Sequence, residues 1–177
     1  MTLVVVSGAP GTGKSTVGAA VASTLRWPLL SLDPVKEALA DVLGLGDEDW
    51  SDRVGDAAAE VIFQLSAEFP DAVAEGWWRG ARRERAVREF AGAVEVFCRC
   101  GPEEAVRRAR ARHGAGRHPI HRDVISPGRM LARVGELAGT VTPLCLGRAL
   151  IIVDTGRPGA AGAAAGEVVA ALGCGSG

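Results

Sequence analysis

Residues 3–15 read LVVVSGAPGTGKS, and this stretch decides the fold. It opens with Leu3–Ser7, a continuous apolar and β-branched run of the kind found in strands that are buried on both faces of a parallel sheet. A glycine-rich loop follows, and helical spacing begins near Lys14. The sequence therefore predicts a strand, a tight loop and a helix in that order.

The alternation of strand and helix continues along the chain. The clearest helical segment spans residues 54–65, where apolar residues recur at intervals that share one helix face. Alternating elements of this kind predict a doubly wound α/β sheet. Four further strand-like runs are predicted at Leu29–Leu32, Ala72–Glu75, Val94–Arg99 and Leu150–Asp154.

The length and composition fit one globular domain. The chain has 177 residues, of which 47% are hydrophobic and 23% are charged. We therefore expect a single domain over residues 1–172 and a disordered, glycine-rich tail over residues 173–177.

The charge balance and the cysteines bear on partners and location. A formal net charge of −1 gives no global field that would attract nucleic acid or an anionic membrane, so we expect neither as a partner. We expect the protein to be a monomer or a homodimer. No apolar run reaches the roughly 18 residues of a membrane span. The four cysteines form no C-x-x-C pair, and we expect a cytoplasmic protein with reduced thiols.

Residues 8–15 match the P-loop pattern G-x-x-x-x-G-K-[ST] at every specified position, between a predicted strand and a predicted helix. Its glycines let backbone N–H groups face phosphates, and the following helix directs its positive end toward them. We expect Lys14 to bridge the β- and γ-phosphates of ATP and Ser15 to bind Mg²⁺. The predicted nucleotide-binding residues of this segment are Gly8, Ala9, Pro10, Gly11, Thr12, Gly13, Lys14, Ser15 and Thr16.

Motifs of other P-loop classes are missing from the sequence. Guanine-specific GTPases need an N-K-x-D motif late in the chain, but no lysine follows Lys36. Ring-forming ATPases and transporters need a strand that ends in Asp-Glu, and none of the predicted strands does. A kinase is the class that remains.

Asp33 stands at the carboxyl end of the second predicted strand, where open α/β sheets bind their ligands. A carboxylate there can accept or orient the proton of an attacking hydroxyl, and can hold Mg²⁺ through water. Because Pro34 follows, Asp33 can instead cap a helix. Both roles remain open, and Ser126 before Pro127 marks another predicted helix start.

Beyond the P-loop, several segments resemble small P-loop kinases that include chloramphenicol phosphotransferase and zeta-toxin-like enzymes. The resemblance runs from Leu3 to about Arg157. It rests on the order of short motifs: Leu32-Asp33-Pro34, the strand of residues 94–100 followed by Gly101-Pro102-Glu103, Arg117-His118-Pro119 with His121 and Asp123, and Val153-Asp154-Thr155.

This resemblance implies a P-loop NTPase fold with a five-stranded parallel sheet in the order 2-3-1-4-5 and helices on both faces. It also implies that Asp33 is the base and that a mobile, arginine-bearing lid spans about residues 113–126. Residues 44–78, where such kinases adapt to their acceptors, match no member closely enough to name a substrate.

Arginines are the predicted source of positive charge in the lid. Arg108 and Arg112 are four residues apart and share a helix face, and Arg117 lies just beyond that helix. We expect Arg112 and Arg117 to act in catalysis, together with Lys14 and Asp33, and Arg108 to bind the nucleotide. Thr155 and Arg157 are expected to border the adenine.

The acceptor site is predicted at the end of the third strand. Glu75 can orient the acceptor hydroxyl or the Mg²⁺ shell and is the other candidate for the base. Trp77 and Trp78 follow it, and we expect an indole to pack on the apolar face of the acceptor, with packing in the core as the alternative. The substrate-binding set is thus Asp33, Glu75, Trp77 and Trp78.

Two other clusters favour simpler interpretations. His113, His118 and His121 lack the ligands that would complete a zinc site, so we expect them to shape the lid. The five arginines of residues 79–88 lack interleaved aromatic residues, which favours a solvated helix over RNA binding.

The sequence thus predicts an ATP-dependent kinase that phosphorylates a hydroxyl of a small molecule, and the resemblance implies an acceptor such as an antibiotic or a sugar-like metabolite. A nucleoside or nucleotide kinase and a non-catalytic ATP-binding switch remain alternatives. An acceptor pocket walled by the tryptophans would favour the first function, an arginine-lined pocket the second, and an Asp33 sequestered as a cap the third.

Overall fold

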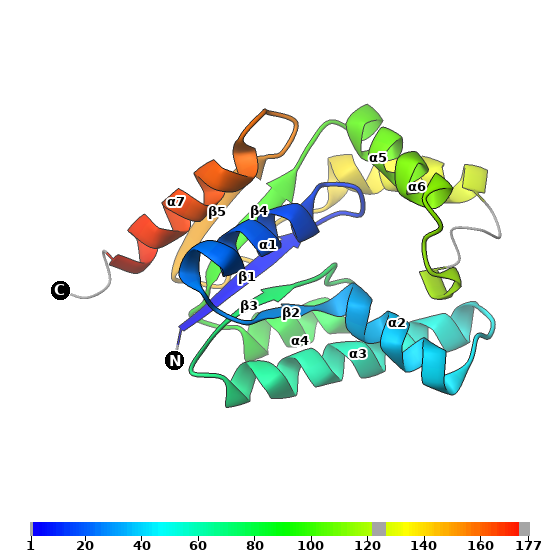
Figure 1. The fold of residues 1–177 in the computed structure, drawn as a ribbon, viewed down its shortest axis with the longest axis horizontal. Coiled ribbons are helices and arrows are strands. Elements are labelled where there is room, and N and C mark those ends of the chain that lie inside the picture. The colour runs from blue at the N-terminus through cyan, green and yellow to red at the C-terminus, as the bar shows by residue number, and fades with distance from the viewer. Residues whose placement is uncertain (1, 122–126, 174–177) are drawn as a thin grey trace.

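A five-stranded parallel sheet runs through the middle of the molecule (Figure 1), in a computed structural model that describes residues 2–121 and 127–173. Every pair of neighbouring strands is parallel, and the strand order is β2-β3-β1-β4-β5, which confirms the predicted fold class. The strands are β1 (Thr2–Gly8), β2 (Leu29–Ser31), β3 (Asp71–Glu75), β4 (Val94–Arg99) and β5 (Ala149–Asp154).

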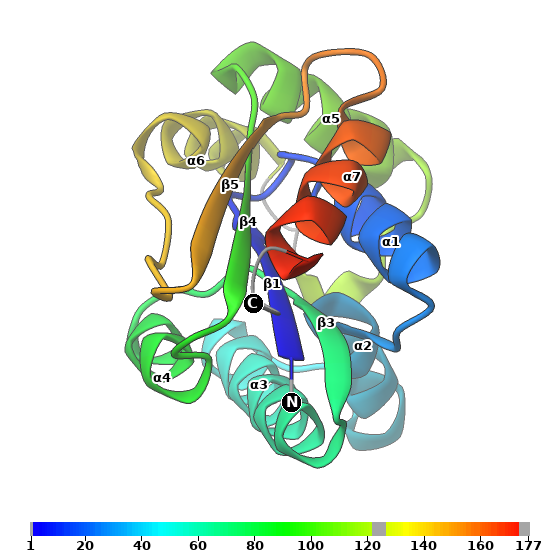
Figure 2. The same cartoon turned by 90° about the vertical axis from the view of Figure 1, so that its left-hand side faces the viewer.

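Helices cover both faces of this sheet (Figure 2). One face packs against α1 and α7, and the other packs mainly against α3 and α4. Successive side chains of β1 alternate between the two cores: Val4 and Val6 join the first, and Val5 joins the second. The helices are α1 (Lys14–Leu25), α2 (Leu32–Leu43), α3 (Glu48–Glu68), α4 (Ala81–Glu89), α5 (Pro102–Gly114), α6 (Pro127–Thr140) and α7 (Ala160–Gly173), with a short 3₁₀ helix η1 (Pro119–His121).

The start of α2 corrects the prediction that Asp33 caps a helix. Ser31 is the N-cap, and Asp33 is the second residue of the helix. Pro34 fits at the third position because N–H groups of the first turn have no partner within the helix. Asp33 therefore projects its carboxylate from the first helical turn and is not sequestered as a cap.

The predicted lid and tail are partly helical. α5 extends to Gly114, and η1 forms a further turn before residues 122–126, which lie outside the described part of the chain together with Asp123 and the predicted cap Ser126. α7 includes Gly173, the first residue of the predicted tail. Residues 174–177, the rest of that tail, also lie outside the described range.

A buried carboxylate joins β4 to the segment before β5. Glu95 is 0% exposed and accepts hydrogen bonds from the Ser7 hydroxyl at 2.6 Å and from the backbone N–H groups of Leu144 at 2.8 Å and Cys145 at 2.7 Å. These donors offset the cost of burying the carboxylate. Glu95 thereby fixes the connection from α6 to β5 against the central strand β1.

The arginines near α4 are partly exposed and also form ion pairs with α3, which the prediction of a solvated helix did not include. Arg79 and Arg82 pair with Asp52 on α3, and Arg85 pairs with Glu60 on the same helix. The Arg82 side chain is only 13% exposed. The acidic side of α3 therefore draws these arginines inward, which the spacing within α4 alone does not predict.

α3 buries Val54, Ala58 and Ile62 as its spacing predicts, whereas Val61 and Leu65 lie at the margin of that face, each 36% exposed. Within residues 2–121 and 127–173, no helix has the length and apolar composition of a membrane span.

Candidate active site

The P-loop links β1 to α1 and depends on three glycines with positive φ, Gly8, Gly11 and Gly13. Gly8 has φ +139°, and a Cβ atom there would lie 2.3 Å from the Cys98 carbonyl oxygen. Gly13, with φ +79°, is the N-cap of α1 and needs the left-handed region that glycine tolerates. The backbone N–H groups at the start of α1 are thereby presented at the end of the sheet, in an arrangement suited to anions.

Lys14 lies within this loop. Its Nζ atom donates to the Ala9 carbonyl oxygen at 2.9 Å, and the residue is 9% exposed. Burial lowers the pKa of Lys14, although Glu75 and Asp33 oppose that shift. The ammonium therefore lies near the loop and near two carboxylates, Glu75 at the end of β3 and Asp33 in the first turn of α2.

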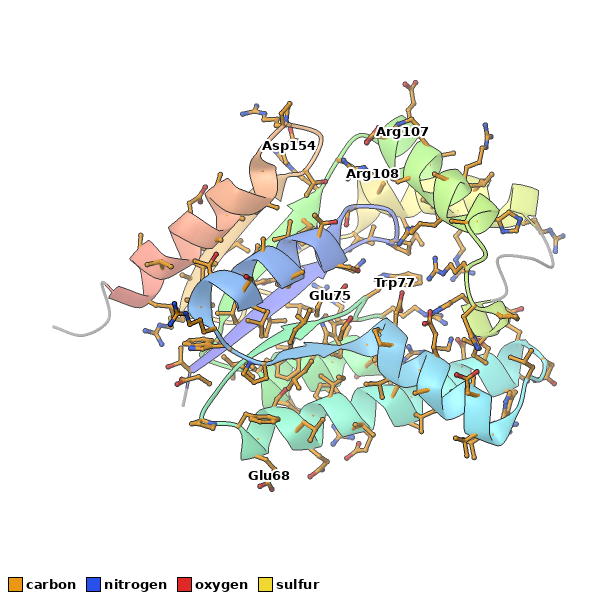
Figure 3. All side chains as sticks on the ribbon, viewed as in Figure 1. Glu68, Glu75, Trp77, Arg107, Arg108 and Asp154 are labelled. Carbon is orange, nitrogen blue, oxygen red and sulfur yellow. The ribbon has the colours of Figure 1, made fainter. Side chains whose placement is uncertain are left out.

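A cavity of about 400 Å³ opens beside the P-loop. Figure 3 shows Glu75 and Trp77 at the end of β3, and Arg107 and Arg108 on α5 above them. Gly8, Ala9 and Thr12 form the inner side of the loop and do not line the cavity. Its lining consists of Pro10, Gly11, Gly13, Lys14, Ser15, Thr16, Asp33, Glu75, Trp77, Arg107, Arg108, Ala111, Arg112 and Arg117.

Glu75 lies at the end of β3 and is 4% exposed. Its Oε2 atom accepts from the Ser31 hydroxyl at 2.5 Å, and the Ser15 hydroxyl also hydrogen-bonds to this carboxylate. Burial raises the pKa of Glu75, while Lys14 and the serine hydroxyls oppose the shift. Glu75 thus contacts the P-loop residue that was predicted to bind Mg²⁺.

Asp33 faces the same cavity from the first turn of α2. Its Oδ2 atom accepts from Arg117 Nη2 at 3.3 Å. Burial alone would raise the pKa of Asp33, but His121, Arg117, Lys14 and Arg112 together hold the pKa below its ordinary value. The carboxylate is therefore ionised at neutral pH and suited to accept a hydrogen bond.

Arg108 links α5 to the loop after β5. It donates to Glu104 at 2.6 Å, to the Thr155 hydroxyl at 2.9 Å and to the Thr155 carbonyl oxygen at 2.7 Å. The Thr155 hydroxyl in turn donates to the Thr12 carbonyl oxygen at 2.8 Å. Arg108 and Thr155 thus brace the P-loop on its outer side.

Arg157 lies away from this cavity. Its side chain is 82% exposed and pairs with Asp154 at 3.5 Å. It does not contribute to the cavity lining, and its predicted place near the adenine stays a prediction.

The two adjacent tryptophans have different environments. Trp77 lines the cavity, and the Arg79 guanidinium lies 5.2 Å from its ring centroid. Trp78 is 3% exposed and packs between Phe63 and Phe90 at centroid distances of 5.6 and 5.2 Å. The prediction that Trp78 binds the acceptor is therefore wrong: successive side chains point to opposite sides of an extended segment, and this one enters the core.

Three lining or supporting residues were not predicted. Arg107 lies at the cavity rim with its side chain 70% exposed, and Ala111 follows one turn later. That four-residue spacing was a usable signal. Ser31, which holds Glu75, offered no signal because a lone serine at a strand end has no specific pattern.

Comparison with known proteins places this geometry among P-loop folds. The family model described as AAA domain matches residues 3–137. A crystal structure from Chloroflexus aurantiacus J-10-fl, provisionally described as a kinase, is 32% identical, with a TM-score of 0.82 and coverage of 96% of this chain and 97% of that one. Among curated proteins, none matches the chain.

More distant structures share the fold. A gluconokinase from Sinorhizobium meliloti 1021 is 18% identical, with a TM-score of 0.62, and 99% of this chain aligns with 98% of that one. A shikimate kinase from Acinetobacter baumannii, in complex with shikimate, is 19% identical, with a TM-score of 0.58 and coverage of 99% and 95%. The fold is thus that of P-loop kinases, while the narrower likeness to chloramphenicol phosphotransferase stays a prediction.

Proposed function

The chain belongs to the AAA domain family, and from this premise we propose that it transfers the γ-phosphoryl group of ATP to a hydroxyl group of a small molecule. One observation carries the proposal: a P-loop with Lys14 and Ser15 shares a single cavity with two carboxylates, Asp33 and Glu75. A phosphate-binding loop beside a carboxylate that can align a hydroxyl is the minimum that phosphoryl transfer requires.

The phosphate side of the proposed reaction uses fixed positive groups. Backbone N–H groups of the P-loop and the Lys14 ammonium bind the β- and γ-phosphates, and Arg112 and Arg117 supply charge from the opposite wall. The Ser15 hydroxyl and the neighbouring Glu75 carboxylate are hard oxygen donors that fit Mg²⁺, which would neutralise phosphate charge.

Asp33 is the proposed group on the acceptor side. An ionised carboxylate accepts the hydrogen bond of the attacking hydroxyl and orients it toward the γ-phosphorus atom. Its lowered pKa makes it a weak base, which suits a loose transition state in which proton transfer comes late. Glu75 is bound to Ser15 and Ser31, and this arrangement favours Asp33 over Glu75 for this role.

The acceptor itself is proposed only by class. Trp77 offers the flat apolar surface of an indole beside the Asp33 carboxylate, a combination suited to a compact molecule with both C–H and hydroxyl groups. Four arginines in the same lining favour a second candidate, a nucleoside or nucleotide kinase, because they can bind an anionic acceptor. A non-catalytic switch loses its main support, since Asp33 is not a helix cap.

A screen with γ-labelled ATP tests the proposal. Sugars, polyols, aminoglycosides, nucleosides and nucleoside monophosphates are incubated with the full chain, Mg²⁺ and ATP, and the Lys14→Ala variant reports the background. Label transferred to one compound class by the wild type alone is the expected result. Release of label only to water, across every class, would contradict the kinase proposal and favour a hydrolase or switch.

A further inference from the structure

Three carboxylates form a row along one face of α2. Asp33, Glu37 and Asp41 are four residues apart, a spacing that stacks side chains on the same helix face. Only the first of them lines the cavity beside the P-loop. The other two lie one and two turns farther along the helix, so their role must be sought elsewhere.

Each member of this row contacts a basic residue of the segment that follows α5, here called the lid segment (residues 115–121). Arg117 Nη2 donates to Asp33 at 3.3 Å, His121 Nε2 lies 2.7 Å from Glu37 Oε1, and His118 Nε2 lies 3.2 Å from Asp41 Oδ1. In Figure 1 this yellow-green stretch descends from α5 to the end of α2. The lid segment is therefore docked on α2 by three matched pairs.

An apolar contact and a hydrogen bond fix the same segment independently. Ile120 is 2% exposed and packs with Ala40 of α2 and Val54 of α3. Its carbonyl oxygen accepts from the Ser51 hydroxyl at 2.7 Å, and Ser51 Oγ accepts from Lys36 Nζ at 2.8 Å. The docked position is thus specified by packing as well as by charge.

The histidines can hold this position in their neutral forms. His118 Nδ1 accepts from the Ile120 N–H at 3.2 Å, so its ring proton resides on Nε2 and points to Asp41. The His121 side chain is 6% exposed, against 36% for Glu37, so this contact is largely removed from water. A shielded hydrogen bond of this kind is more valuable than an exposed ion pair.

We propose that Glu37 and Asp41 are positioning residues of the transfer reaction: by holding His121 and His118, they place the lid segment so that Arg117 lies beside Asp33 at the acceptor end of the cavity. This role rests on the proposed kinase function, whereas docking of the lid segment does not. Neither residue touches the cavity, so each acts through the histidine that it holds.

Amide hydrogen exchange, followed by NMR on the full chain without nucleotide, tests the docking. The variants are Glu37→Ala and Asp41→Ala, which keep good helix formers in α2. Glu68→Ala is the matched control, because Glu68 is an exposed carboxylate at the far end of α3 (Figure 3). The reporters are the amides of Ile120 and His121, which are bonded to His118.

Glu37→Ala should speed exchange at both amides about tenfold, and Asp41→Ala about twofold, because the Asp41 side chain is 71% exposed. Glu37→Gln keeps an oxygen acceptor for His121 and should restore most of the protection. Melting temperatures close to wild type exclude general unfolding. Unchanged exchange in Glu37→Ala would overturn the contribution of Glu37 to docking and, with it, the positioning role.

Kinetics with the acceptor found in the screen test the second half of the proposal. Glu37→Ala should lower kcat about tenfold with little change in the KM for ATP, and Glu37→Gln should recover most of the loss. Faster exchange with an unchanged kcat would overturn the positioning role. A wild type that transfers to no acceptor overturns the proposed function and this role with it, while the exchange result still decides whether the lid segment is docked.

Discussion

The two halves of the cavity are built in different ways. The phosphate half comes from one continuous segment, residues 8–16, and its shape follows mainly from the backbone torsions of its glycines. The acceptor half is assembled from β3, α2, α5 and the lid segment, and its shape depends on side-chain contacts such as Arg117–Asp33 and Glu75–Ser31. The first half is therefore fixed by local sequence, and the second by contacts between residues distant in the chain.

This difference indicates where substrate choice can change without loss of the fold. Substitutions of the P-loop glycines alter a tight backbone turn that packs on β4, so they affect nucleotide binding and structure together. Substitutions of Asp33 or Arg117 in the acceptor half replace partly exposed side chains and should be tolerated by the fold. The predictions below separate the two halves by comparing nucleotide affinity, turnover and stability.

Lys14→Ala should have the largest effect and should act on the phosphate half. Because the ammonium acts on charge that is concentrated on the transferred group, we expect transfer to fall about 10³-fold or more. The fold should persist, since Lys14 Nζ contacts only the loop carbonyl of Ala9 among its described hydrogen bonds. Turnover near that of the wild type, measured with γ-labelled ATP, would refute the role of the P-loop.

The double substitution of Arg112→Ala with Arg117→Ala tests the arginines on the lid side of the cavity. We expect kcat to fall about 10²-fold while the Kd for ATP changes less, because these arginines act on charge that develops during transfer. Arg110→Ala, at an exposed position of the same helix, is the matched control and should be neutral. A parallel loss in ATP affinity, with kcat intact, would make the two arginines simple nucleotide ligands.

Glu75→Gln should give the smallest effect, on the pH dependence of stability. Because the folded-state pKa of Glu75 is raised above 4.5, the folded chain holds this proton more tightly than the unfolded chain. Its contribution is therefore favourable at low pH and is lost as the pH rises from about 4.5 through the raised pKa.

Glu75→Gln removes this titration, so its stability relative to wild type should increase over that pH window and then stay constant. Urea unfolding at several pH values measures the difference. A stability difference that does not vary with pH would contradict the raised pKa of Glu75.

The contrast between the halves also explains what could be read from the sequence. The strand at residues 94–99 was predicted with the bounds it has, because a doubly buried strand has a continuous apolar pattern. The P-loop was predicted because its glycines and Lys14 have a fixed local spacing. In both cases neighbouring residues alone determine the structure.

The acceptor half could not be predicted to the same depth. Asp33 has two plausible roles in sequence, and only the position of Ser31 as the N-cap of α2 separates them. Trp78 could not be assigned to the core without knowing that Phe63 and Phe90 lie beside it. The pairing of His121 with Glu37 joins residues 84 positions apart, and no local pattern encodes it.

The most direct test of the central claim measures phosphoryl transfer and ATP affinity side by side in the wild type and in Asp33→Asn. The asparagine preserves shape and removes the anionic acceptor of the hydroxyl proton, so transfer should fall by about 10²- to 10⁴-fold. The Kd for Mg·ATP and the melting temperature should stay close to those of the wild type. Near-full transfer by Asp33→Asn to the acceptor used by the wild type would contradict the account and direct attention to Glu75.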